Sequence, residues 1–150
     1  MASTRPPNIL FFFPDQHRAD WLGGNPTLPL QTPNLDALAA RGTQMDRVFT
    51  PSPLCAPARA CLASGCRYDA SPVSSNRENF PLGAPTYYRH LREAGYHVCG
   101  VGKFDLRKDG KNRPADFDWH LDGSRHLADW GFSEGIDNEG KIDGSAAYRD

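Results

Sequence analysis

Three residues whose types could do chemistry stand close together in the stretch LCAPARACLASG, residues 54–65. Cys55 supplies a thiol, Pro57 follows two positions later, and Arg59 two positions after that. The pattern predicts a short helix over residues 56–63 with Cys55 at its entrance, because proline fits a first helical turn. At a helix N-terminus, backbone N–H groups and the dipole favour an anion. The stretch is therefore a candidate site for a nucleophile that attacks an anionic substrate.

Two further groups follow continuous apolar runs, which are typical of strands buried on both faces. Asp15 and Gln16 come just after the run at residues 8–13. Lys103 comes just after a second run at residues 96–101. Ligands of open α/β sheets bind beyond the carboxyl ends of the strands. We therefore expect both groups at the same rim of a sheet as the cysteine.

The three groups together predict a metal-assisted attack on a sulfate or phosphate ester. The oxygens of Asp15 and Gln16 suit a hard divalent cation such as calcium, magnesium or manganese. Lys103 can hold an oxyanion. Each group alone has an ordinary explanation, as a turn, a solvated lysine or an inert thiol. Their arrangement along one rim favours a shared chemical role.

The rest of the chain alternates between helix and strand patterns. Thr32 and Pro33 read as an N-cap followed by proline at the first helical position, and Gly42 ends that helix. The further elements that we predict are a short strand at residues 45–49, a loop at 66–85 and a helix at 86–94. The pattern weakens from residue 104 onward. The alternation predicts an α/β fold whose mostly parallel sheet is flanked by helices.

Composition and charge limit the classes of binding partner and the cellular location that we expect. The chain has 150 residues and a formal net charge of −1, with basic and acidic residues interleaved. No long-range field therefore favours nucleic acid or an anionic membrane. The apolar run near the N-terminus is too short for a signal peptide or a membrane helix. We therefore expect a cytoplasmic location with reduced thiols.

The cysteines and histidines show no zinc-ligand spacing. None of the four cysteines forms a Cys-x-x-Cys pair, and no His-x-x-x-His pair occurs. We expect Cys61, Cys66 and Cys99 to be small buried apolar residues. His97 is expected to be an ordinary strand residue, so a histidine-rich metal site is not predicted.

Four segments resemble the sulfatase family, which is part of the alkaline phosphatase superfamily. CAPAR resembles the family's Cys-x-Pro-x-Arg signature, and Leu62, Ser64 and Gly65 continue it. The segments NILFFFPDQ, TPNLDALAARG and LREAGYHVCGVGK are also similar, in the family's order. The resemblance spans residues 8–103. It implies that residues 1–150 form the N-terminal portion of a sulfatase catalytic domain with an alkaline phosphatase-like fold.

The resemblance also implies a modification. In sulfatases a maturation enzyme oxidises the signature cysteine to formylglycine, and the proline and arginine belong to its recognition sequence. Cys55 would then be the formylglycine precursor, and a formylglycine-generating enzyme would be a partner. In the hydrated aldehyde, one hydroxyl, activated by the metal, attacks sulfur and expels the alcohol. The other hydroxyl helps to eliminate sulfate, so the implied function is hydrolysis of small-molecule sulfate esters.

Roles for single residues follow from the resemblance as well. Asp15 and the modified Cys55 would bind the metal. Gln16, which stands where many sulfatases have a second aspartate, would lie close enough to be a ligand too. Arg59 would orient and stabilise the formylglycine oxygen, and Lys103 would bind the sulfate oxygens.

Two positions point to a particular branch. The Asp15-Gln16 pair resembles phosphonate monoester hydrolases and choline sulfatase. Asn76 resembles a substrate-contacting asparagine of the former, although a loop hydrogen bond explains it equally well. Many sulfatases read Gly-Lys-Trp-His where this chain reads Gly-Lys-Phe-Asp, so Asp105 replaces a histidine that would contact the formylglycine hydroxyl. Either Asp105 accepts that proton or the substrate differs, which argues against ordinary arylsulfatase specificity.

Local geometry links Asp105 to Lys103. Residues two apart on an extended segment point to the same side. If Lys103 faces the substrate and the chain stays extended through Phe104, Asp105 should face the substrate too, and Phe104 should point into apolar packing. The dipeptide Asp137-Asn138 imitates the family's second metal pair. No apolar strand precedes it, so we interpret it as a turn and expect the pair beyond residue 150.

Three functions remain open at this point. The first is a sulfatase, whose isolated fragment could be inactive. The second is a phosphodiester or phosphonate monoester hydrolase with the same formylglycine and metal. The third is a non-catalytic binding module that keeps the fold, for which Cys55 would stay unmodified. The alcohol group of the substrate and the oligomeric state cannot be derived from these residues.

Overall fold

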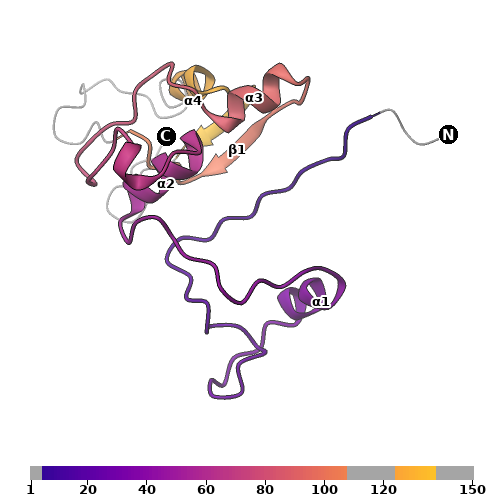
Figure 1. The fold of residues 1–150 in the computed structure, drawn as a ribbon. Coiled ribbons are helices and arrows are strands. Elements are labelled where there is room, and N and C mark those ends of the chain that lie inside the picture. Colours follow the sequence, from indigo (N-terminus) through magenta and orange to yellow (C-terminus); the bar gives the residue numbers. More distant parts are fainter. Residues whose placement is uncertain (1–4, 108–123, 138–150) are drawn as a thin grey trace, which may run out of the picture. The chain divides into compact units, whose positions relative to one another are not determined.

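The computed structural model describes residues 5–107 and 124–137, which belong to two compact units, Met1–Val48 and Phe49–Asp150 (Figure 1). The first unit contains α1 (Pro33–Arg41). The second contains α2 (Cys55–Ser64), the 3-10 helix η1 (Tyr68–Ala70), α3 (Tyr87–Glu93), β1 (Cys99–Gly102), α4 (Ser124–Trp130) and β2 (Glu134–Asp137). None of the helices described is long and apolar enough to cross a membrane.

The first unit is organised around α1, which the sequence predicted. Thr32 is the N-cap, Pro33 opens the helix and Gly42 ends it. The Thr32 hydroxyl accepts a hydrogen bond from the N–H of Gly23 at 2.7 Å and donates one to Asp36 at 2.9 Å. A Cβ atom at Gly23 would lie 2.9 Å from the Thr32 nitrogen, so this close approach requires glycine.

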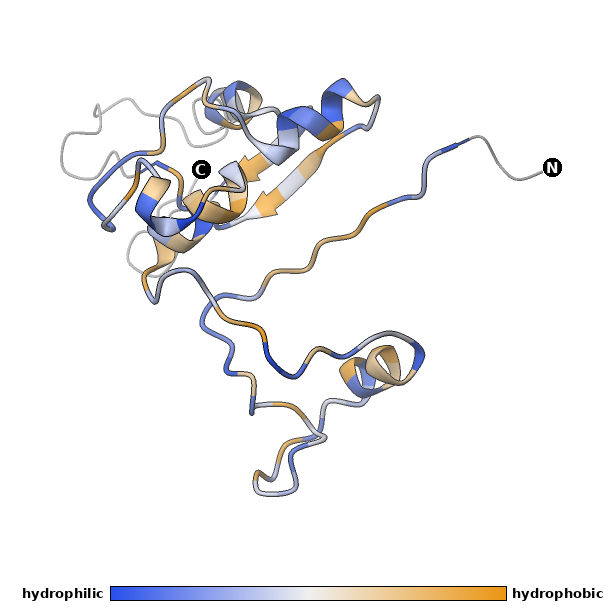
Figure 2. Ribbon diagram, viewed as in Figure 1, coloured by the Kyte–Doolittle hydropathy of each residue, from blue (hydrophilic) through white to orange (hydrophobic). Residues whose placement is uncertain are grey.

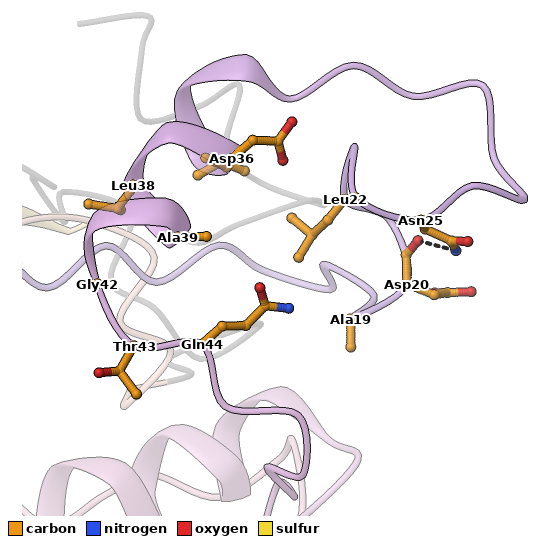
Figure 3. A pocket seen from close by; sticks show the side chains of 12 residues that line it. Ala19, Asp20, Leu22, Asn25, Asp36, Leu38, Ala39, Gly42, Thr43 and Gln44 are labelled. Carbon is orange, nitrogen blue, oxygen red and sulfur yellow. Dashed lines mark hydrogen bonds between the residues drawn. The ribbon is translucent and has the colours of Figure 1, made fainter.

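A hollow of about 670 Å³ lies beside α1 in this unit (Figure 3). Leu22, Leu35 and Leu38 give it an apolar lining, and Asp20 and Asp36 add carboxylates. It contains none of the residues that the sequence predicted for the site.

The predicted strand at residues 8–13 is wrong. These residues are extended but form no strand in the described structure, and Leu10 and Phe12 are 93% and 80% exposed. Figure 2 shows the apolar colouring along this extended segment. A strand buried on both faces needs neighbours for its N–H and C=O groups, and the sheet of the described residues consists of β1 and β2 without this run. The predicted strand at residues 45–49 is wrong for the same reason.

The sheet of the second unit confirms the predicted parallel α/β arrangement on a small scale. β1 and β2 pair in parallel, with Cys99 opposite Glu134 and Gly102 opposite Asp137. β1 is shorter than the predicted run at residues 96–101. β2 corrects a second expectation, because a strand does lead directly into Asp137. Its sequence EGID carries little apolar signal, and its pairing with β1 and packing against α4 define it instead.

The core of the second unit gathers aromatic and aliphatic side chains from its helices, strands and loops. Its fully or almost fully buried members include Val73, Phe80, Leu106, Leu127, Trp130 and Phe132. Thr86, the buried N-cap of α3, accepts a hydrogen bond from the N–H of Arg89 at 3.1 Å and donates one to the carbonyl of Trp130. The indole N–H of Trp130 donates to the carbonyl of Pro81 at 3.2 Å. These bonds join α3, α4 and the loop before α3.

The burial of the cysteine side chains differs in part from the prediction. Cys61 is buried in α2, as expected, whereas Cys66 and Cys99 are exposed. Cys66 follows Gly65, whose left-handed conformation ends α2. Cys99 points to the opposite face of β1 from Gly100, whose inner side meets the rings of Phe104 and Phe132.

Candidate functional site

Helix α2 begins at Cys55 and carries the candidate nucleophile in its first turn, as the sequence predicted. Leu54, the N-cap residue, supplies no side-chain cap. The side-chain oxygen of Asn76 does so instead, accepting a hydrogen bond from the N–H of Ala56 at 2.9 Å. Pro57 is buried in the same turn. The half-buried Cys55 therefore sits on a backbone that a loop residue holds in place.

Arg59 joins α2 to the end of β1. It lies one turn after Cys55 and therefore on the same helix face. Its guanidinium Nη1 donates a hydrogen bond to the carbonyl oxygen of Lys103. Two residues that the sequence placed in one site are thus brought together, although they are 44 positions apart in the chain.

Lys103 and Asp105 form an ion pair with 3.5 Å between Nζ and Oδ2. Their side chains are only 14% and 2% exposed, so the pair is not a solvated surface contact. The Phe104 ring meets the Phe132 ring edge to face, with 4.9 Å between the centroids. The two polar side chains therefore share one side and Phe104 packs into apolar surroundings, as predicted.

The backbone does not stay extended through this segment. Asp105 has a φ of 59°, a left-handed conformation that aspartate, asparagine and histidine adopt more readily than other non-glycine residues. The pairing with Lys103 thus comes from a turn after β1 and not from a continued strand.

Asp137 belongs to this site, although the sequence pointed only to a turn. It ends β2, is 7% exposed, and accepts a hydrogen bond from the N–H of Phe104 at 3.2 Å. The parallel register sets Asp137 beside Gly102, so the carboxyl ends of both strands meet here. The apolar residues Phe132 and Ile136 were the only indication of β2 in the sequence. The glycine and acidic residues between and after them break the apolar pattern that would predict a strand. Asn138 lies outside the described residues.

Tyr88 is a second residue that the sequence did not single out. Its ring lies 4.2 Å from that of Phe132. Burial, with a smaller effect of Tyr87, holds the pKa of Tyr88 well above its ordinary value. The nearby charges of Arg59 and Asp137 act on the pKa in opposite directions. A neutral phenol therefore stands close to the arginine and the aspartate of the site.

Asp15 and Gln16 lie in the first unit. They form a turn, and Gln16 has a left-handed φ of 55°. Their adjacent carboxylate and amide oxygens are donors that suit a hard cation. Cys55 belongs to the second unit, so the joint metal site of these three residues stays a prediction.

Comparisons with known proteins bear on what this arrangement does. The profile of the sulfatase family matches residues 7–147. The chain is 37% identical over 131 residues to choline-sulfatase of Rhizobium meliloti (strain 1021), which covers 80% of this chain and 26% of that protein. It is 31% identical over 127 residues to N-acetylglucosamine-6-O-sulfatase of Bacteroides thetaiotaomicron, covering 82% and 22%.

A mammalian relative shows the same similarity. Arylsulfatase A of Homo sapiens is 37% identical over 114 residues, which cover 71% of this chain and 22% of that protein. The chain therefore spans about a quarter of the length of these relatives.

Proposed function

Because the chain belongs to the sulfatase family, whose members are sulfuric ester hydrolases with an alkaline phosphatase-like fold, we propose that the whole protein hydrolyses small-molecule sulfate esters. We further propose that residues 1–150 form the N-terminal portion of its catalytic domain. The match over residues 7–147 and the quarter of each relative's length that it covers support this placement.

One observation carries the proposal: the first turn of α2 is tied to the end of β1. Cys55 opens α2, and Arg59 on the same face donates a hydrogen bond to the carbonyl of Lys103. A nucleophile and two cations are thus held in one part of the unit. The helix N-terminus and the cations favour an anionic ester beside Cys55.

Each residue has a role in this proposal. Cys55 is converted to formylglycine by a maturation enzyme and supplies the attacking oxygen. Arg59 orients that oxygen, and Lys103 holds the sulfate oxygens. Asp105 keeps the Lys103 ammonium in place and accepts the proton of the formylglycine hydroxyl.

A divalent cation, calcium before manganese or magnesium, completes the proposed site. Asp15, Gln16 and the modified Cys55 would hold it, and their oxygen donors fit a hard cation. When bound, it would polarise the attacking hydroxyl and neutralise developing charge. The Asp-Gln pair also supports the branch that contains choline sulfatase and phosphonate monoester hydrolases, and a choline-sulfatase is among the relatives.

A second candidate function is hydrolysis of phosphate diesters or phosphonate monoesters with the same residues. Asp105 favours this alternative, because it places a carboxylate where many sulfatases have histidine. A sulfate monoester, a phosphate diester and a phosphonate monoester each carry one negative charge, so Asp105 would discriminate among them through the proton acceptor and the shape that it presents and not through net charge. The balance between ester classes should therefore depend on this residue.

Rates on a matched aryl sulfate, phosphate diester and phosphonate monoester test the proposal. The full-length protein, coexpressed with a maturation enzyme, should hydrolyse the sulfate fastest. Cys55→Ala should abolish activity on all three esters, and Cys66→Ala, at an exposed cysteine elsewhere, should leave it unchanged. Asp105→His should change the ratio of the three rates. Equal activity of Cys55→Ala and Cys66→Ala would exclude the proposed nucleophile and favour the non-catalytic alternative.

A further inference from the structure

Three side chains of different ligand types converge at the amino ends of β1 and β2. The imidazole Nε2 of His97 lies 3.1 Å from Oε1 of Glu134, and the sulfur of Cys99 lies 3.2 Å from the same oxygen. All three ligand atoms are within 4.8 Å of one another. The side chains of His97 and Glu134 are 66% and 68% exposed, so the cluster is open to solvent.

The backbone explains why these side chains meet. The parallel register sets Cys99 directly opposite Glu134. His97 precedes Cys99 by two residues, and residues two apart on extended backbone point to the same side. The strand register therefore accounts for the approach of Cys99 to Glu134, and His97 reaches the same carboxylate from just before β1. The cluster could not be found from spacing in the sequence alone, because two of its members are separated from the third by more than thirty residues.

We propose that His97, Cys99 and Glu134 form a zinc site. Zn²⁺ binds thiolate, imidazole and carboxylate ligands, and its bond lengths put tetrahedral ligands about 3.3–3.8 Å apart. The distances from Oε1 of Glu134 to His97 and to Cys99, 3.1 and 3.2 Å, are already close to that spacing, and the ligand atoms of His97 and Cys99 lie within 4.8 Å of each other. Binding replaces the thiol proton of Cys99, which leaves to solvent as the Zn–S bond forms, and water takes the fourth position.

This site is separate from the proposed catalytic site. Lys103 and Asp137 stand at the carboxyl ends of the same strands, where Gly102 pairs with Asp137. Gly102 comes three positions after Cys99, a distance of about 10 Å along a strand. The zinc proposal therefore does not depend on the proposed hydrolysis, and its donor set with sulfur and nitrogen differs from the oxygen donors proposed there.

Titration of the full-length protein with Co²⁺ and then Zn²⁺ tests the site. A Co²⁺–thiolate absorption band reports only metal bound to cysteine, so oxygen-only sites do not contribute. The experiment uses a Cys55→Ala background, which removes the thiol of the proposed catalytic site. We expect one Co²⁺ to give this band and Zn²⁺ to displace it.

Two matched pairs of variants assign the ligands. Cys99→Ser should abolish the band, and Cys66→Ser should leave it intact. His97→Gln should weaken Zn²⁺ binding at least roughly tenfold, since even the loss of a ligand's supporting partner costs 10–100-fold. His90→Gln, at an exposed histidine paired with Glu93, should have no effect. No band in the parent protein, or equal titrations of His97→Gln and His90→Gln, would overturn the proposal; circular dichroism checks that each variant is folded.

Discussion

At the scale of single residues, Asn76 holds the first turn of α2 from outside the helix. Its side-chain oxygen accepts the N–H of Ala56, directly after Cys55. This bond gives Asn76 a structural role and leaves its amide NH₂ group as the part that could contact a substrate. The two roles can therefore be separated by substitutions that keep or remove the oxygen.

We expect Asn76→Ala to lower the free energy of unfolding by about 1 kcal/mol, the usual cost of losing a helix cap. Asn76→Asp keeps an oxygen acceptor at the positive end of the helix, so it should restore stability. It should still lower kcat/KM, because the new negative charge repels an anionic ester. Chemical denaturation and steady-state kinetics measure the two effects. Full activity of Asn76→Asp would argue against a substrate contact.

The buried ion pair of Lys103 and Asp105 makes a second prediction at this scale. Lys103→Ala should reduce kcat on the order of 10²–10³ by removing a cation from an oxyanion site. It should also destabilise the protein, because it leaves the Asp105 carboxylate buried without its cation. Adding Asp105→Asn should recover stability but not turnover. A double variant that regains turnover would show that Lys103 serves the fold alone.

At the scale of elements, the paired ends of β1 and β2 set the position of the segment that carries Lys103. Asp137 accepts the N–H of Phe104, and the Phe104 ring packs against Phe132. A Cβ atom at Gly100 would lie 2.5 Å from both rings. Strand β1, the turn after it and the rings of Phe104 and Phe132 thus pack closely against one another.

We therefore expect Asp137→Ala to lower kcat more than Asp137→Asn does. Asparagine keeps an oxygen acceptor, whereas alanine leaves the Phe104 N–H unsatisfied, at a cost of about 1–3 kcal/mol if it stays buried. The freed segment should then hold Lys103 less accurately. Kinetics on the preferred ester, with unfolding measured in parallel, compare the two variants. Identical kinetic losses in both would mean that the charge of Asp137 matters and not its hydrogen bond.

The helices show which elements a sequence can predict. Thr32-Pro33 and Gly42 mark the ends of α1, Thr86 caps α3, and the Cys55–Arg59 segment opens α2, all through local signals. The strands depend on distant partners instead. The apolar run at residues 8–13 has the composition of a buried strand but is not a strand in the described structure.

The residues of the site also fall into those that local sequence predicts and those that only distant contacts reveal. Cys55 and Arg59 are four residues apart, so their shared helix face was predictable. Asp137 reaches Phe104 across 33 positions, and only the pairing of β2 with β1 reveals this contact. The left-handed backbone of Asp105 is likewise set by tertiary contacts and not by its neighbours in sequence.

At the scale of the whole molecule, the proposed site requires residues of both units. Asp15 and Gln16 belong to Met1–Val48, and Cys55, Arg59 and Lys103 belong to Phe49–Asp150. The aligned part of this chain covers only 22–26% of each of these relatives. The proposed metal site must therefore be tested in the full-length protein.

Asp15→Asn should weaken Ca²⁺ binding to the full-length protein, because it removes an anionic oxygen ligand. Asp20→Asn is the matched control, since Asp20 is an exposed aspartate of the same unit that pairs with Arg18. Isothermal titration calorimetry with Ca²⁺ compares the two variants with the parent. Equal affinities in all three proteins would remove Asp15 from the proposed metal site.

The central claim is that Cys55 is the precursor of the nucleophile. Mass spectrometry of the peptide that contains Cys55, after coexpression of the full-length protein with a formylglycine-generating enzyme, tests it most directly. We predict that this peptide loses the sulfur of Cys55 and carries an aldehyde that reacts with a hydrazine probe, while Cys61 keeps its thiol. A peptide in which Cys55 stays wholly unmodified, under conditions where a known sulfatase is converted, would contradict the account.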